Sequence, residues 1–288
     1  PAGLAYIKSK QTMFMYQPWV VGINNIYAGV AINYPLYGTL ALTMNYMDYG
    51  DEAVTTVSNP EGTGEFYSAS EFAASVSYGR RIVNWFSFGA SAKYISSNIW
   101  HTSASAMAFD LGVLVTTDFF SATGKRNQGM KIGMSISNYG TRLRYDGIDL
   151  LVPIDPNPDE FGNFDDVEGL YNTSEWELPL IFRLGFSVQP IYTNNLRLLV
   201  AADALHPNNN NESVNIGTQL TYIQPGKLNL FLRGGYKGLF LKDSEYGLTY
   251  GAGVRLYLSD FNFFDIDYTY KTMGILGDVH LYTFKFSF

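Results

Sequence analysis

Apolar and polar side chains alternate along most of this chain with the period of two that is typical of β-strands. The pattern is clearest at the end of the chain, where alternate positions form one almost wholly aromatic row: His280, Tyr282, Phe284, Phe286 and Phe288. In water, an aromatic face on a terminal strand and its free edge would promote aggregation. Lipid can cover such a face, and closure of the sheet into a barrel removes the edge. The pattern therefore predicts a membrane barrel.

The same alternation predicts about 14 strands joined in turn by short and long connections, and an even strand number is typical of bacterial outer-membrane barrels. In such barrels the short turns and both chain ends face the periplasm. We therefore expect an all-β fold, a closed antiparallel transmembrane β-barrel that forms one domain over residues 1–288. The strands are expected over residues 11–17, 24–34, 37–47, 66–79, 84–96, 104–119, 128–140, 178–191, 196–205, 214–223, 228–238, 246–258, 261–271 and 279–288. The long outer connections would contain Asp51, Asp159, Asn209, Lys242 and Gly274.

The first part of the chain needs separate treatment. Residues 11–47 carry no Asp, Glu, Lys or Arg, but they contain prolines and alternate with period two, which excludes a transmembrane helix. Residues 1–10 are expected to form a lead in the periplasm or the lumen. Because the chain starts at Pro1 rather than at Met, we expect a signal peptide and an N-terminal segment to be missing from it.

Composition agrees with a barrel and excludes several functions. The chain has 22 Tyr, 20 Phe and only 16% charged residues. Its mean hydropathy of −0.04 is expected of a barrel, because the apolar lipid-facing residues and the polar lumen-facing residues cancel in the average. The net charge of −7 argues against a nucleic acid as partner. The absence of cysteine excludes disulfides and thiol chemistry. We expect no cofactor.

Most charges within the expected strands fall on one face, which we place in the lumen, since an Arg or Lys facing lipid at mid-depth costs about 2–4 kcal/mol. Opposite signs lie on neighbouring strands. This arrangement allows a polar conduit or ligand site, but we favour a structural network of ion pairs, because pairing is the usual way to bury charge. The predicted network contains Arg183, Asp203, Arg233, Arg255, Asp265, Asp267 and Lys285, with Lys271 on the same face.

Residues 146–177 hold ten carboxylates, no Lys or Arg, and several apolar side chains. Asp155, Asn157 and Asp159 have the spacing that begins an EF-hand loop, but Glu160 stands where that loop requires Gly. We therefore favour a solvated or partner-facing loop over a calcium site. The residues expected to contact a protein partner are Asp155, Asp159, Glu160, Phe161, Phe164, Asp165 and Asp166.

Catalytic motifs are not evident. His101, His206 and His280 are the only histidines, and they belong to no metal or nucleophile motif. His101 and His206 would lie near the outer rim, where some barrel enzymes have their sites, but we expect no enzyme. The Gly251-Ala252-Gly253 run lies within a strand with no helix after it, which excludes dinucleotide binding.

Several short motifs resemble the PorV/PorQ family of outer-membrane proteins, whose barrel is similar to that of the FadL fatty-acid transporters. Residues 1–5 (Pro-Ala-Gly-Leu-Ala) resemble the end of that family's Asn-Pro-Ala-Gly-Leu-Ala, and residues 178–185 resemble its Leu-Pro-Leu-Asn-Leu-Arg-Leu-Gly. Residues 138–145 are similar to its Asn-Leu-Gly-Pro-Lys-Ile-Ser-Tyr, but depart at Thr141 and Arg142.

The resemblance implies a FadL-like barrel of the type IX secretion system in a bacterial outer membrane. Its outer loops would bind the C-terminal domains of secreted cargo or other subunits of the translocon and attachment machinery, and the bilayer would cover its wall. The alternative is a FadL-like transporter of hydrophobic small molecules, which requires an apolar pocket inside the barrel and an exit such as a break in a strand.

Overall fold

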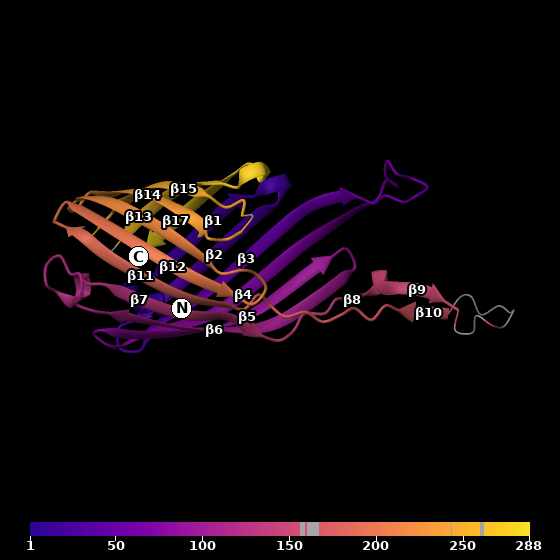
Figure 1. Cartoon of the computed structure of the whole chain (residues 1–288), viewed down its shortest axis with the longest axis horizontal. Coiled ribbons are helices and arrows are strands. Elements are labelled where there is room, and N and C mark those ends of the chain that lie inside the picture. Colours follow the sequence, from indigo (N-terminus) through magenta and orange to yellow (C-terminus); the bar gives the residue numbers. More distant parts are fainter. Residues whose placement is uncertain (156–158, 160–166, 243, 260–261) are drawn as a thin grey trace.

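The computed structural model describes residues 1–155, 159, 167–242, 244–259 and 262–288. One antiparallel sheet contains 15 strands, and all of them except the two-residue β8 form the wall of a closed 14-stranded barrel (Figure 1). β1 pairs with β17 and β5 with β6, so the sheet has no free edge. The wall strands are β1 (Gln11–Pro18), β2 (Asn24–Tyr34), β3 (Gly38–Ala53), β4 (Phe66–Val83), β5 (Phe86–Ile99), β6 (Thr102–Thr116), β7 (Lys131–Gly140), β11 (Ile181–Tyr192), β12 (Leu196–Pro207), β13 (Ser213–Gln224), β14 (Leu228–Leu239), β15 (Leu248–Tyr257), β16 (Phe263–Thr272) and β17 (Asp278–Ser287).

Smaller elements lie outside the wall. β8 (Asp146–Gly147) pairs with the end of β6, and β9 (Leu151–Ile154) pairs with β10 (Val167–Leu170) in a separate hairpin. Single 3₁₀ turns are η1 (Ala2–Tyr6), η2 (Val20–Gly22), η3 (Arg126–Gln128), η4 (Ile148–Leu150) and η5 (Gly274–Leu276). Among the described residues, none forms a helix with the length and apolar character needed to cross a membrane.

The predicted all-β closed barrel is confirmed, and each expected strand corresponds to one wall strand. The ends of several strands differ. Residues 48–53 were expected in a loop, but they extend β3 and pair with the start of β4. Because this stretch carries Asp48, Asp51 and Glu52, its polarity resembles a loop although its backbone continues the ladder.

We name the two ends of the barrel by their connections. The turn end carries Phe288 and the short connections 35–37, 193–195 and 225–227; the loop end carries the long connections 54–65 and 141–180. Two connections differ from expectation. At the loop end, β5 and β6 are joined by the two-residue turn Trp100–His101, whereas at the turn end residues 117–130 form a long connection with η3.

The two faces of the wall differ as the alternation predicts. Tyr282, Phe284 and Phe286 point outward and are 37–40% exposed, whereas Ser287 is buried on the inner face. Outward aromatic and aliphatic side chains recur on all wall strands, and only contact with lipid would remove so much apolar surface from water.

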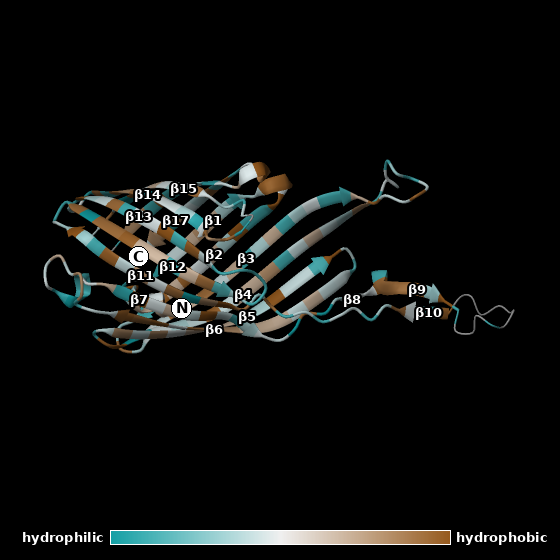
Figure 2. Cartoon of the chain, viewed as in Figure 1, coloured by the Kyte–Doolittle hydropathy of each residue, from teal (hydrophilic) through white to brown (hydrophobic). Residues whose placement is uncertain are grey.

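The wall is taller on one side. β3, β4, β5 and β6 have 16, 18, 14 and 15 residues, whereas β7 and β11 to β17 have 10 to 12. The far ends of β3 and β4 and the β9–β10 hairpin therefore project from the loop end (Figure 1), and the projecting end of β3 is hydrophilic (Figure 2).

Candidate functional site: the lumen and its loop end

A cluster of ion pairs lies inside the barrel near the turn end. Arg255 donates two hydrogen bonds to Asp265, with distances of 2.7 Å from Nε to Oδ1 and 2.8 Å from Nη2 to Oδ2. Lys285 Nζ lies 2.7 Å from Oδ2 of the same carboxylate. The three residues are direct cross-strand partners on β15, β16 and β17, so the register alone brings them together on the inner face.

A second ion pair lies closer to the loop end. Arg233 Nη1 is 2.5 Å from Asp267 Oδ1, and its Nε donates to Gln219 at 2.8 Å. Of the predicted network, Arg183 and Asp203 are the exceptions. Both face the lumen, but in the described part of the chain neither lies within 4.0 Å of an oppositely charged group.

Sequence reasoning missed a third polar cluster, on β5 to β7. Lys93 Nζ lies 2.6 Å from Asp110 Oδ1 and also donates to the side chain of Asn138. Asn138 adopts φ of +65°, which Asn tolerates better than most residues, and its backbone N–H donates to Asp110 at 2.8 Å. The pairing between β6 and β7 shifts here, as in a β-bulge.

The bulge also changes the neighbouring wall. β7 pairs with β11 only as far as Ser137, which lies opposite Ile181. Beyond it, the Asn138 side chain donates to the Pro179 carbonyl at 3.0 Å, and β7 continues against β6 alone. The ladder between β7 and β11 is therefore interrupted toward the loop end. Pro179, which has no backbone N–H to donate to a ladder, lies at this interruption.

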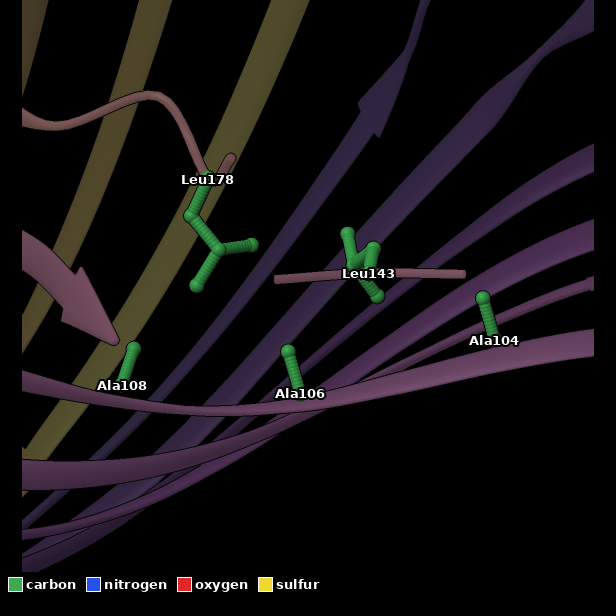
Figure 3. Close-up of a cluster of buried hydrophobic side chains, with 5 residues drawn as sticks. All are labelled: Ala104, Ala106, Ala108, Leu143 and Leu178. Carbon is green, nitrogen blue, oxygen red and sulfur yellow. The ribbon is translucent and has the colours of Figure 1, made fainter. Parts of the chain in front are cut away.

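The loop end holds a buried apolar cluster inside the barrel. Ala104, Ala106 and Ala108 follow one another along the inner face of β6, and Leu143 and Leu178 pack against them (Figure 3). Backbone hydrogen bonds of 2.9 and 3.0 Å join Leu143 to Trp176, so the two arms of the 141–180 connection enter the mouth of the barrel together. The small alanine side chains leave room for the two leucines.

The start of the chain also lies in the lumen. Gly79, Gly89 and Gly112 are cross-strand partners on β4, β5 and β6, and together they form a row without side chains on the inner wall. η1 packs against this row: a Cβ atom added at Gly89 would lie 2.5 Å from the backbone nitrogen of Ala2. The lead segment expected in the periplasm or lumen thus narrows the lumen.

The residues predicted to contact a protein partner are only partly described. Asp155 and Asp159 lie next to the β9–β10 hairpin, whereas Glu160, Phe161, Phe164, Asp165 and Asp166 lie outside the described residues. The hairpin exposes 43–52% of Leu151, Ile154, Val167 and Leu170. Within the described ranges, no group of three or more His, Asp or Glu side chains could hold a metal ion. Asn157 of the EF-hand-like run lies outside those ranges.

The three histidines lie toward the loop end, where two of them bond to loop carboxylates and the third joins two wall strands. His101 Nδ1 is 2.9 Å from Asp149, and its backbone N–H donates to the same carboxylate at 2.9 Å. His206 lies 3.0 Å from Glu212, and His280 lies 2.8 Å from the Tyr268 hydroxyl. The first contact fixes the base of the β9–β10 hairpin to the β5–β6 turn.

The two carboxylates bonded to histidines have perturbed acidities. Desolvation opposes ionisation of Asp149, but the hydrogen bonds from His101 outweigh it and hold the pKa of Asp149 below its ordinary value. Hydrogen bonds from its own backbone amide and from His206 lower the pKa of Glu212. Both carboxylates therefore stay ionised to a lower pH than an unperturbed carboxyl group, and each contact weakens as the pH falls through the lowered pKa.

Together, the closed wall, the apolar exterior and the polar interior define a membrane β-barrel. No protein-family model and no curated protein matches the sequence. Among solved structures, the fold is similar to the toluene transporter TbuX of Ralstonia pickettii, with a TM-score of 0.58 and 10% identity over 100% of this chain and 92% of that one.

Two further solved structures share the fold. The toluene transporter TodX of Pseudomonas putida has a TM-score of 0.57 and 9% identity, over 99% of this chain and 90% of its own. A FadL homologue of Pseudomonas aeruginosa has a TM-score of 0.56 and 10% identity, over 100% of this chain and 92% of its own. At these identities the likeness establishes a FadL-like barrel fold. The resemblance to the PorV/PorQ family stays a prediction, because the similarity concerns the fold alone.

Proposed function

We propose that this barrel spans a bacterial outer membrane, with its turn end toward the periplasm, and conducts hydrophobic small molecules. The observation that carries the proposal is the apolar surface inside the loop end, where Leu143 and Leu178 cover the alanines of β6. The similarity of the fold to two toluene transporters supports the same reading. This is the alternative that the sequence left open, and the buried apolar cluster of β6, Leu143 and Leu178 supports it.

The packing suggests how a ligand would enter. A buried Leu side chain contributes about 1.5–3 kcal/mol through removal of its surface from water. A hydrophobic ligand offers equivalent surface, so it can take the place of Leu143 and Leu178 against β6 at little net cost. The interruption between β7 and β11 lies beside the arm that carries Leu178, and we propose it as the lateral route from the lumen to lipid.

The apolar surface is tested by filling it. Ala106→Trp should lower the uptake of radiolabelled toluene and oleate by cells that express the barrel at least about tenfold, because the indole would fill the space against β6 that a ligand needs and a loss of about 1.4 kcal/mol in binding is a factor of ten. Ala90→Trp is the matched control, since Ala90 lies on β5 and faces outward, and it should leave uptake unchanged. Uptake by the Ala106→Trp variant at the rate of the unaltered barrel would contradict the proposal. So would uptake by cells with the unaltered barrel that is no faster than uptake by cells without it.

A second candidate function is docking of secreted cargo domains or of type IX secretion subunits, as the resemblance to the PorV/PorQ family implies. The projecting β9–β10 hairpin favours it. An isolated two-stranded hairpin is marginally stable in water, and this one exposes apolar side chains next to an acidic segment. A partner with apolar and basic side chains would cover both features.

This docking role predicts that replacement of residues 151–170 by a Gly-Ser linker abolishes capture of purified C-terminal domains from type IX cargo proteins. Replacement of residues 208–212 at the same end of the barrel serves as the control and should preserve capture. If the linker variant still captures the domains at the wild-type level, the hairpin is not the docking element.

A further inference from the structure

Three cationic side chains at the loop end of the lumen have no carboxylate partner. We name Arg183 of β11, Lys237 of β14 and Lys271 of β16 the cation triad. The Lys237 backbone N–H donates to the Gly247 carbonyl at 3.0 Å, and Lys271 lies opposite Thr249 of β15, so the two lysines lie on either side of β15 with an offset of two residues. Lys237 interacts electrostatically with both Arg183 and Lys271.

The triad differs from the layers below it. On β14 to β17, Arg233, Arg255 and Lys285 each lie within 2.7 Å of a carboxylate oxygen. In the parts of the chain that the structure describes, no member of the triad has an oppositely charged group within 4.0 Å. Lys237 and Lys271 are half-buried and Arg183 is exposed. Like charges at half-buried positions destabilise a fold unless a counter-charge joins them.

Nearby carboxylates have other partners or remain apart. Glu245 accepts a hydrogen bond from the Ile275 backbone N–H at 3.0 Å, and Asp278 lies opposite Thr272, at the start of β17. Asp203 lies opposite Gly185, two residues from Arg183 toward the turn end, and forms no ion pair with Arg183. In the described residues, the three cations of the triad therefore have no carboxylate in contact with them, although the chain as a whole has a net charge of −7.

A small cavity lies beside Lys237, which is the only member of the triad that lines it, and apolar side chains such as Ile181 and Leu205 form much of its wall. Its volume is about 220 Å³, and Asn209, Ser213 and Asn215 contribute amide and hydroxyl groups to its lining. Tyr246 lies on the same cavity, with its ring centroid 3.7 Å from Lys237 Nζ. The cavity is large enough for a phosphate or a short dicarboxylate and too small for a long acyl chain.

We propose that the cation triad binds a small hydrophilic oxyanion, one that carries a phosphate or carboxylate group, at the loop end of the lumen. The guanidinium fork of Arg183 and the ammonium groups of the two lysines are the donors that recognise such groups. The ligand is a free solute rather than a lipid headgroup, because the triad faces the lumen. The site does not depend on the apolar surface of β6.

Calorimetry on the purified barrel in a neutral detergent tests the site, with sodium phosphate and sodium succinate as separate probes at constant ionic strength. We expect saturable binding of at least one anion, weakened at least about tenfold by Lys237→Gln with Lys271→Gln, since charge-assisted hydrogen bonds contribute about 1.5–3 kcal/mol each. Lys227→Gln with Lys242→Gln removes the same charge outside the lumen and should leave the affinity unchanged. Lys237→Arg with Lys271→Arg should retain binding.

Three results would overturn the proposal. The first is the absence of saturable heat with either anion, and the second is equal affinity of the unaltered barrel and the Lys237→Gln, Lys271→Gln variant. The third is equal weakening by the control substitutions, which would indicate unspecific attraction. Heat-modifiable migration in electrophoresis verifies that each variant is a folded barrel. Hydrophobic uptake is measured separately with Ala106→Trp, so failure of one proposal leaves the other standing.

Discussion

Asp265 is 3% exposed and contacts two cations, Arg255 and Lys285, whose side chains are 24% and 26% exposed. Loss of one member of a buried ion pair is costly because the remaining charge stays desolvated, whereas replacement of all members by apolar groups is often neutral. The carboxylate compensates two charges at once. Its removal therefore affects stability more than the removal of either cation.

Asp265→Asn should lower the free energy of unfolding by about 3 kcal/mol, at the low end of the range for broken buried pairs because both cations retain some solvent contact. Urea titration of the barrel in lipid vesicles, followed by tryptophan fluorescence, measures the change. Asp51→Asn, at an exposed position near the far end of β3, should alter the value by no more than about 0.5 kcal/mol.

A rescue variant separates charge from packing. Asp265→Leu combined with Arg255→Met and Lys285→Met removes the whole cluster and should regain most of the lost stability. Equal destabilisation by Asp265→Asn and Asp51→Asn would show that the ion pairs do not support the barrel.

The strands could be predicted because the alternation of apolar and polar residues is a local property, which can be recognised without knowing the partner strand. β2 matches its predicted bounds, residues 24–34, for this reason. The far end of β3 could not be predicted, because beyond the lipid layer both faces meet water and the apolar half of the pattern disappears. The cluster of Arg255, Asp265 and Lys285 could also be predicted, because its three strands follow one another along the chain and pair as neighbours.

Features that depend on the register of distant segments could not be predicted. Gly79, Gly89 and Gly112 form a row only when β4, β5 and β6 are aligned, and nothing in their spacing indicates that η1 covers them. The same holds for Leu143 and Leu178, which lie in a long connection that folds back into the barrel. Hydropathy identifies these two leucines as apolar, but it does not predict that their side chains point into the barrel.

The two halves of the barrel have different interiors. On β4 to β6 the inner face is mostly small or apolar apart from the Lys93–Asp110 ion pair, and η1 and the two arms of the 141–180 connection cover much of it. On β11 to β17 the inner face carries the ion pairs and the cation triad. An apolar solute and a hydrophilic anion would therefore contact opposite sides of one lumen, while acidic and apolar groups project from the loop end.

All these roles require a closed barrel whose aromatic rows face lipid, and β17 offers the most direct measurement. Because the chain contains no cysteine, single cysteines can be introduced at positions 281–286 and spin-labelled one at a time in vesicles. Lipid-soluble oxygen should reach labels at Tyr282, Phe284 and Phe286 far better than labels at Leu281, Thr283 and Lys285. A profile without this two-residue period, or low oxygen access at all six positions, would contradict the account.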